Sequence, residues 1–366
     1  MTRLWWAQIK SVVRLEMKKT FFARRGLWIY ILALLPLLLF SAHAAMTSHE
    51  RGRSGEMVRQ SERKLTSQDL RSVHPDMTSD EVTGLLGRPP VRFRWNERRH
   101  LESGDVVVVP HESYRYSDGT NDLTIAFEDG KVSSINIREG MNMPEDSVIF
   151  AGVFQFFYLR LAIFFGCLGI FMNLFRGEIL DKSLHFYFLA PIRRDVLMVG
   201  KFLAGLLATC VIFVTSELLQ IIVFTGQFSP NVRDLYLYQN HGLAQAAAYL
   251  GVTALACLGY GAFFLAAGML FKNPILPAAG ILIWEAANPF LPALLKKFSV
   301  IYYLKSLCPV DIPTPPGTPP LLALLVSNPD PVSTPVAILG IVIVAMLVLY
   351  VSSFQVRRME INYTSE

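Results

Sequence analysis

Residues 27–45 read LWIYILALLPLLLFSAHAA, an apolar run without a single lysine, arginine, aspartate or glutamate. A hydrocarbon core about 30 Å thick takes roughly 20 helical residues to cross, so this run predicts a membrane-spanning helix. Seven lysine and arginine residues precede it. Because basic segments stay on the cytoplasmic side, residues 1–26 are expected in the cytoplasm, with residues 4–17 forming an amphipathic helix at the membrane surface.

The same run permits a second interpretation, a cleaved secretory signal peptide. Ala42-His43-Ala44 has the small-residue pattern of a cleavage site. The basic region before it is longer than such signals usually carry, which favours a retained membrane span.

The composition agrees with a membrane protein. The chain has 366 residues, of which 52% are hydrophobic and 17% are charged, too apolar a balance for an ordinary soluble domain. The net charge of +5 comes from basic residues beside the apolar runs, where they set topology, so no nucleic-acid partner is expected. Three of the four cysteines lie inside apolar runs, and neither a disulfide framework nor a metal site is indicated.

Five further apolar runs predict five further spans. They are approximately residues 147–175, 199–224, 242–270, 275–291 and 335–354. The fold class is therefore a polytopic α-helical membrane protein with six transmembrane helices and both termini cytoplasmic, including the tail 355–366. The proline-rich segment 292–334 is expected to be a re-entrant or outer cap.

The second span needs a choice of register, because its apolar run contains Arg160. A charged side chain at the bilayer centre costs about 2.5–3.5 kcal/mol on insertion scales. We therefore place the span at about residues 156–175, with Arg160 near the outer edge and residues 148–155 along the interface.

Residues 46–146 interrupt the apolar pattern and predict a small extracytoplasmic α+β domain. Thr78 and Glu81 have the spacing of a capping box that opens a short helix, and Gly87 ends it. Further along, apolar residues alternate through 123–127, and Asp129-Gly130 predicts a hairpin turn into a strand. Two short helices on an antiparallel sheet are expected.

The segment 66–138 within this domain resembles the SmpA/OmlA family of small bacterial outer-membrane assembly lipoproteins. The stretches that carry the resemblance are DMTSDEVTGLLGRP from Asp76, the motif YRY from Tyr114 and LTIAFEDGKV from Leu123. Since the segment has no lipid-attachment cysteine at its start, the flanking spans would anchor it. No outer-membrane assembly role is inferred, because one small fold can serve many contacts.

The cytoplasmic loop 176–198 and the start of the third span carry the main functional motif. Its residues are Arg176, Glu178, Lys182, Leu189, Pro191, Arg193 and Lys201. This pattern resembles the permeases of ATP-binding-cassette exporters of the ABC-2 type, with Ser183 where a glycine or threonine is more usual. The resemblance implies that these residues couple the permease to a separate ABC ATPase subunit. It also implies a bacterial inner-membrane location and a homodimer or heterodimer with a second permease.

This chain is not expected to be an enzyme. It lacks the Gly-x-x-x-x-Gly-Lys-Ser/Thr loop that binds nucleotide phosphates, so ATP and Mg²⁺ are expected on the partner ATPase, with no cofactor here. No catalytic or metal-ligating pattern is visible. Glu217 and Glu285 are acidic residues at membrane depth and are the candidate pathway residues. Besides the ATPase and the second permease, membrane lipids are the expected partners.

Two other functions remain open. A membrane-anchored sensor or assembly factor could display residues 46–146 to a partner, although one span would suffice for that. A membrane-embedded enzyme is the third, without a visible acid, base or metal constellation. The sequence does not indicate the exported substrate.

Overall fold

The computed structural model describes residues 2–22, 26–100, 106–119, 121–138, 143–180, 189, 192–271, 273, 275–313 and 331–358. The chain forms two compact units. One comprises Met1–Phe40 with Ser147–Glu366, and the other comprises Ser41–Asp146.

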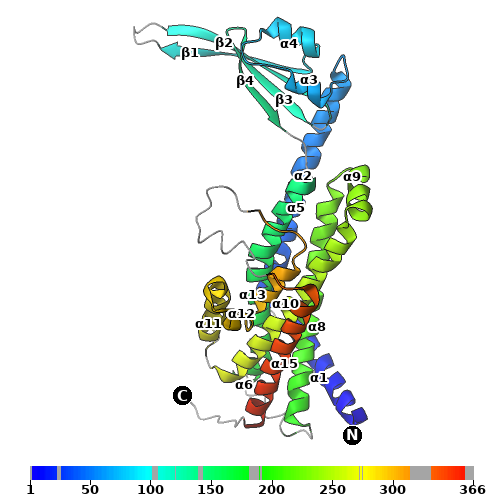
Figure 1. Ribbon diagram of the computed structural model, residues 1–366, viewed down its shortest axis with the longest axis vertical. Helices are drawn as coiled ribbons and strands as arrows, with labels where there is room; N and C mark the ends of the chain where they lie inside the picture. The colour runs from blue at the N-terminus through cyan, green and yellow to red at the C-terminus, as the bar shows by residue number, and fades with distance from the viewer. Residues whose placement is uncertain are drawn as a thin grey trace. The chain divides into compact units, whose positions relative to one another are not determined.

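The first unit is helical (Figure 1). Its elements are α1 (Thr2–Phe22), the first part of α2 (Leu27–Gln60), α5 (Met143–Gly152), η2 (Val153–Ile163), α6 (Phe164–Leu180), α8 (Arg194–Gly226), α9 (Pro230–Asp234), η3 (Leu235–Gln239), α10 (Gly242–Leu270), α11 (Ile275–Ala286), η4 (Asn288–Phe290), α12 (Ala293–Lys296), α13 (Val300–Leu307) and α15 (Thr334–Arg358).

Among the described residues, five helices are long and apolar enough to cross a membrane. They are Leu27–Gln60, Met143–Glu178, Arg194–Gly226, Gly242–Leu270 and Thr334–Arg357. This bears out the prediction of a helical membrane protein. The predicted fifth span, 275–291, contains the 12-residue helix α11 followed by the turn η4, which is shorter than a bilayer requires. The six-span topology therefore stays a prediction.

The region of the second predicted span is helical throughout residues 143–180, and its middle part, η2, is a π-helix. The structure therefore has no break between the expected interfacial segment and the expected span. Arg160 lies on η2 with its guanidinium 5.2 Å from the centre of the Phe156 ring. π-Helical turns in longer helices are frequently found at functional sites.

The core of this unit forms where α6, α8 and α10 pack together. A Cβ at Gly268 of α10 would lie 3.0 Å from the backbone of Met172 in α6, so the two helices approach as closely as a glycine permits. Small residues allow such close helix contacts in membranes, where packing rather than hydrophobicity drives association.

The second unit contains a four-stranded antiparallel sheet in the order β1-β2-β3-β4. The strands are β1 (Val91–His100), β2 (Val106–Ser117), β3 (Asp122–Glu128) and β4 (Lys131–Arg138). Helices α3 (Ser67–Arg71) and α4 (Ser79–Leu86) complete the predicted pair of short helices on a sheet. Asp129 and Gly130 connect β3 to β4 with φ angles of 52° and 78°, which confirms the predicted hairpin turn.

Local signals fixed the helices of this unit. Thr78 and Glu81 form the predicted reciprocal capping box at the start of α4, and Gly87 ends the helix with φ 84°. One apolar core lies between helices and sheet. It contains Leu65, Leu70, Val73, Val82, Leu86, Tyr114, Tyr116, Leu123, Ile125, Phe127 and Val132. The alternating residues of β3 all point into this core, as their pattern predicted.

The end of α2 differs from the hydropathy pattern. Helix α2 continues through the polar residues after position 45 as far as Gln60, since helix formation does not require apolar residues. Ala42-His43-Ala44, the cleavage-site pattern, lies within this helix.

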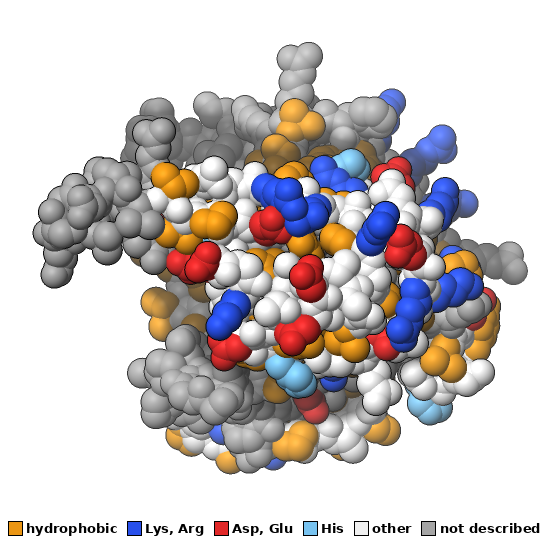
Figure 2. Space-filling model, turned by 90° about the horizontal axis from the view of Figure 1, so that it is seen from above, with side chains coloured by type: hydrophobic (Ala, Val, Ile, Leu, Met, Phe, Trp, Pro, Cys, Tyr) orange, Lys and Arg blue, Asp and Glu red, His pale blue; other side chains and the backbone are white. Residues whose placement is uncertain are grey.

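Seen from above, basic and acidic side chains are interspersed over the described part of the visible face, without a region of one sign (Figure 2).

Candidate functional site

Two residues of the predicted coupling motif meet in a buried charge cluster. Glu178 lies near the end of α6, and Lys201 is the eighth residue of α8. The Lys201 side chain has no exposed surface, and its Nζ is 2.7 Å from Oε2 of Glu178. The cluster therefore joins the two helices that flank the predicted coupling loop.

Helix α1 supplies the other half of the cluster. Lys201 Nζ donates hydrogen bonds to Oε1 of Glu16, at 2.7 Å, and to the carbonyl oxygen of Leu174, at 2.8 Å. Lys19 Nζ donates to Oε1 of Glu178, at 3.0 Å. Two lysines and two glutamates from three helices thus form one network, which we call the buried charge cluster.

The energetics of this cluster follow from its burial. Glu16 and Lys201 are 3% and 0% exposed. An isolated charge is very costly in such a place, whereas two ammonium and two carboxylate groups compensate each other. Removing one partner of a buried pair leaves an uncompensated charge and typically costs about 3–5 kcal/mol. The cluster can exist only when α1, α6 and α8 are together.

Close backbone packing holds α1 against α8, as Figure 1 shows. A Cβ at Gly200 would lie 2.9 Å from Cβ of Val12, so α1 can approach here only because position 200 has no side chain. Near the start of α1, the guanidinium of Arg193 lies 4.9 Å from the centre of the Trp5 ring. Arg193, another residue of the predicted motif, thus also contacts α1.

Two further predicted coupling residues, Arg176 and Leu189, lie outside the cluster. Arg176 is half-buried in α6, and its Nε is buried without a hydrogen-bond partner among the described residues. Leu189 is 78% exposed. Lys182 and Pro191 lie outside the described residues, so their predicted role is untested.

Glu16 and Lys19 also belong to this site, although they are not among the predicted site residues. A usable signal was present, because Glu16 is the sole acidic residue before Glu50. It also follows Val12 by four positions, which places both on one helix face, and both are buried. An acidic residue on the apolar face of a basic helix indicates a buried cationic partner.

The candidate pathway residue Glu217 lies in α8 and is fully buried. Neither carboxylate oxygen has a hydrogen-bond partner within the described part of the chain. The hydroxyl groups of Tyr249 and Thr253, on α10, are also buried without a hydrogen-bond partner among the described residues. Buried polar groups are normally satisfied, so these three residues are candidates for contact with water or with a bound polar group.

The other candidate, Glu285, has a structural role in α11. Its Oε1 accepts a hydrogen bond from the backbone N–H of Val300, at 3.0 Å. Its Oε2 accepts from the hydroxyl of Ser299 and from the backbone N–H of Ile301, at 2.9 and 2.8 Å. Glu285 therefore caps the N-terminus of α13, where a carboxylate satisfies unpaired N–H groups and the helix dipole.

No group of three or more histidine, cysteine, aspartate or glutamate side chains is arranged to hold a metal ion within the described residues. Comparison with family models, with curated proteins and with solved structures gives no match for this chain. The buried charge cluster is therefore the candidate functional site.

Proposed function

We propose that this chain is the membrane-spanning permease subunit of an ABC-2 type exporter. The observation that carries the proposal is the buried charge cluster, in which Lys201 bonds to α1 and to α6 at once. The loop between α6 and α8 is the segment that would dock the ATPase. A force on that loop would act on helices already fixed to each other and to α1.

This arrangement suits the transmission of a movement. Charge-assisted hydrogen bonds are directional and stronger than neutral ones, so the cluster would keep α1, α6 and α8 moving as one body. ATP hydrolysis by the separate ATPase subunit, which would bind ATP and Mg²⁺, would then rock this body against the rest of the transporter. Two permease subunits, identical or different, would form the complete membrane part. The setting would be the bacterial inner membrane, with residues 46–146 on the extracytoplasmic side.

The test begins with purification of the full-length protein from its native membranes and identification of a co-purifying cassette ATPase by mass spectrometry. We expect the Glu178→Lys variant to lose substrate-stimulated ATP hydrolysis, because it places a third cation in the cluster. Arg233→Glu, a charge reversal in α9, should leave hydrolysis unchanged.

A second variant separates coupling from misfolding. Leu189→Asp alters an exposed position of the loop and leaves the cluster intact, and it should weaken ATPase co-purification without lowering thermal stability. Leu235→Asp, at an exposed position of η3, is the matched control. Absence of any cassette ATPase from the purified protein, or equal coupling in all variants, would refute the proposal.

The alternative function is a membrane-anchored sensor or assembly factor. It is favoured by the separate compact unit Ser41–Asp146, which has its own apolar core. Under this alternative, an extracytoplasmic protein would co-purify with the full-length chain, and no ATPase would.

A further inference from the structure

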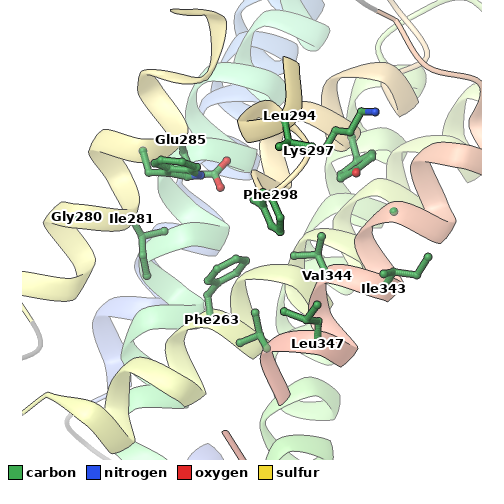
Figure 3. A pocket seen from close by; sticks show the side chains of 14 residues that line it. Phe263, Gly280, Ile281, Glu285, Leu294, Lys297, Phe298, Ile343, Val344 and Leu347 are labelled. Carbon is green, nitrogen blue, oxygen red and sulfur yellow. The ribbon is translucent and has the colours of Figure 1, made fainter. Parts of the chain in front are cut away.

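The helical unit contains a pocket of about 590 Å³ among α10, α11, α12, α13 and α15. Sites for small molecules commonly measure about 300–1,000 Å³. Its walls are mainly apolar, with Phe263 from α10, Ile281 from α11 and Val344 from α15 among them. Figure 3 shows these side chains around the space. The pocket therefore has the size and the lining for an alkyl chain.

The two ends of the pocket differ in chemistry. Lys297 lies with Leu294 at one end, while Leu347 lies at the other (Figure 3). Lys297 is exposed, and it makes no ion pair within the described part of the chain. The pocket thus combines a cationic rim with an apolar interior, which matches an anionic headgroup joined to a hydrocarbon chain.

Glu285 also lines the pocket and would repel an anion if its charge were free. Its two oxygens instead accept three hydrogen bonds from Ser299, Val300 and Ile301 at the start of α13. The helix N-terminus compensates a carboxylate in this position. Lys297 is therefore the uncompensated charge at the pocket, and it selects for an anion.

The pocket is continuous with apolar surface that faces outward. Leu294 and Ile343 line it and are 71% and 62% exposed. In a protein whose helices are apolar enough to cross a membrane, such surface is in contact with lipid. Membrane proteins use basic residues beside spanning helices to bind anionic headgroups.

We propose that this pocket binds one acyl chain of an anionic phospholipid, with the headgroup phosphate beside Lys297. The inference does not depend on the ABC-2 proposal, because it concerns a different set of helices from the buried charge cluster. Failure of the ATPase experiment would leave it unaffected, and its own failure would leave the ATPase proposal standing.

The glycines of the unit provide a precise test. A Cβ at Gly280, on the pocket wall, would meet no atom within 4 Å, and the same is true of Gly251 on α10 outside the pocket. Both residues are exposed and helical. Gly280→Phe should therefore fill the pocket without disturbing the fold, and Gly251→Phe is its matched control.

The experiment uses the full-length protein reconstituted in vesicles that contain phosphatidylglycerol with a photoreactive group at the end of one acyl chain. Mass spectrometry maps the labelled residues. We expect labelling around Phe263 and Val344, reduced about tenfold by Gly280→Phe and unchanged by Gly251→Phe; a tenfold change corresponds to about 1.4 kcal/mol.

The headgroup is tested separately. Lys297→Gln should weaken labelling by phosphatidylglycerol about fivefold, the effect of one basic residue against an anionic membrane lipid. Lys297→Arg should retain it, and zwitterionic phosphatidylcholine should label weakly in every variant. Equal labelling of the Gly280→Phe and Gly251→Phe proteins would overturn the proposal. So would cross-linking from the pocket to a second copy of the chain in place of lipid, or equal labelling by both lipids.

Discussion

Lys201 and Glu16 are separated by 185 positions in the chain, yet the ammonium of one lies 2.7 Å from the carboxylate of the other inside the helical unit. This contact attaches the N-terminal helix α1 to α8. Together with Lys19 and Glu178, it links the C-terminal parts of α1 and α6 to the N-terminal part of α8.

Replacing Lys201 with Met should destabilise the protein by about 3–5 kcal/mol, because Glu16 and Glu178 would remain buried without their shared cation. Thermal unfolding of the purified protein in detergent measures this loss. Adding Glu16→Gln should restore part of the stability, with a coupling of about 0.5–3 kcal/mol. Arg14→Gln, an exposed change on α1, serves as the control. Strict additivity of the two changes would show that the pair does not interact.

Gly200→Leu should displace α1, since even a Cβ at this position would lie 2.9 Å from Val12. Overpacking of this kind typically costs about 1–3 kcal/mol. Limited trypsin digestion should then cut faster after Lys10 and Arg14. Gly226→Leu, on the same helix with no atom within 4 Å of the added Cβ, should leave the digestion rate unchanged. Identical rates for both variants would contradict the described packing.

Topology can be tested with single cysteines in a cysteine-free background. Ser117 is buried, so the exposed Ser134 of β4 is the better reporter for the polar unit, and the exposed Leu189 reports on the loop. A membrane-impermeant thiol reagent added to intact cells should label Ser134→Cys, while Leu189→Cys should react after permeabilisation. The reverse pattern would show that the predicted orientation is wrong.

The polar unit should fold on its own, because its apolar core lies within residues 65–132. The fragment should begin at residue 46, since Ser54 of α2 donates a hydrogen bond to Asp122 at 2.8 Å. We expect a cooperative melt for residues 46–142, and Leu123→Ala should lower stability by about 2–5 kcal/mol. Asn136→Ala, at an exposed position, should have little effect. A fragment without a cooperative transition would contradict this prediction.

The same fragment should lose stability in acid. Hydrogen bonds from Thr66 lower the pKa of Asp69, and hydrogen bonds from Thr78 lower that of Glu81. Burial alone would raise the pKa of Glu112, but hydrogen bonds from Arg92 and Tyr114 outweigh it and give a net decrease.

A depressed pKa stabilises the folded state above the unfolded value and ceases to do so as the pH falls through the folded value. The contribution of these three carboxylates to stability should therefore be constant above about pH 5.5 and decline once the pH passes below the ordinary values of 4.5 for glutamate and 3.8 for aspartate. Urea unfolding at several pH values measures this. Glu81→Gln should reduce the loss of stability at low pH more than Asp80→Asn, which neutralises another carboxylate on the same helix. Identical slopes for both would rule out the contribution of the cap.

Features that depend on neighbours along the chain could be predicted from the sequence. Long apolar runs predicted the membrane-type helices, because burial in hydrocarbon requires an unbroken apolar segment of sufficient length. The capping box at Thr78, the turn at Asp129-Gly130 and the alternation in β3 predicted the polar unit, because caps, turns and strand faces are set by a few adjacent residues.

Tertiary structure alone decided which distant groups meet. The sequence places Glu16 on the apolar face of a basic helix, but only the packing of α1 on α8 makes Lys201 its partner. Glu285 was predicted as a candidate pathway residue, which stays a prediction, and only the position of α13 makes its carboxylate a helix cap as well. Which of these groups pair depends on how helices far apart in the sequence pack together. No local sequence pattern specifies the pairs, because the attraction between opposite charges becomes strong only after packing has excluded water.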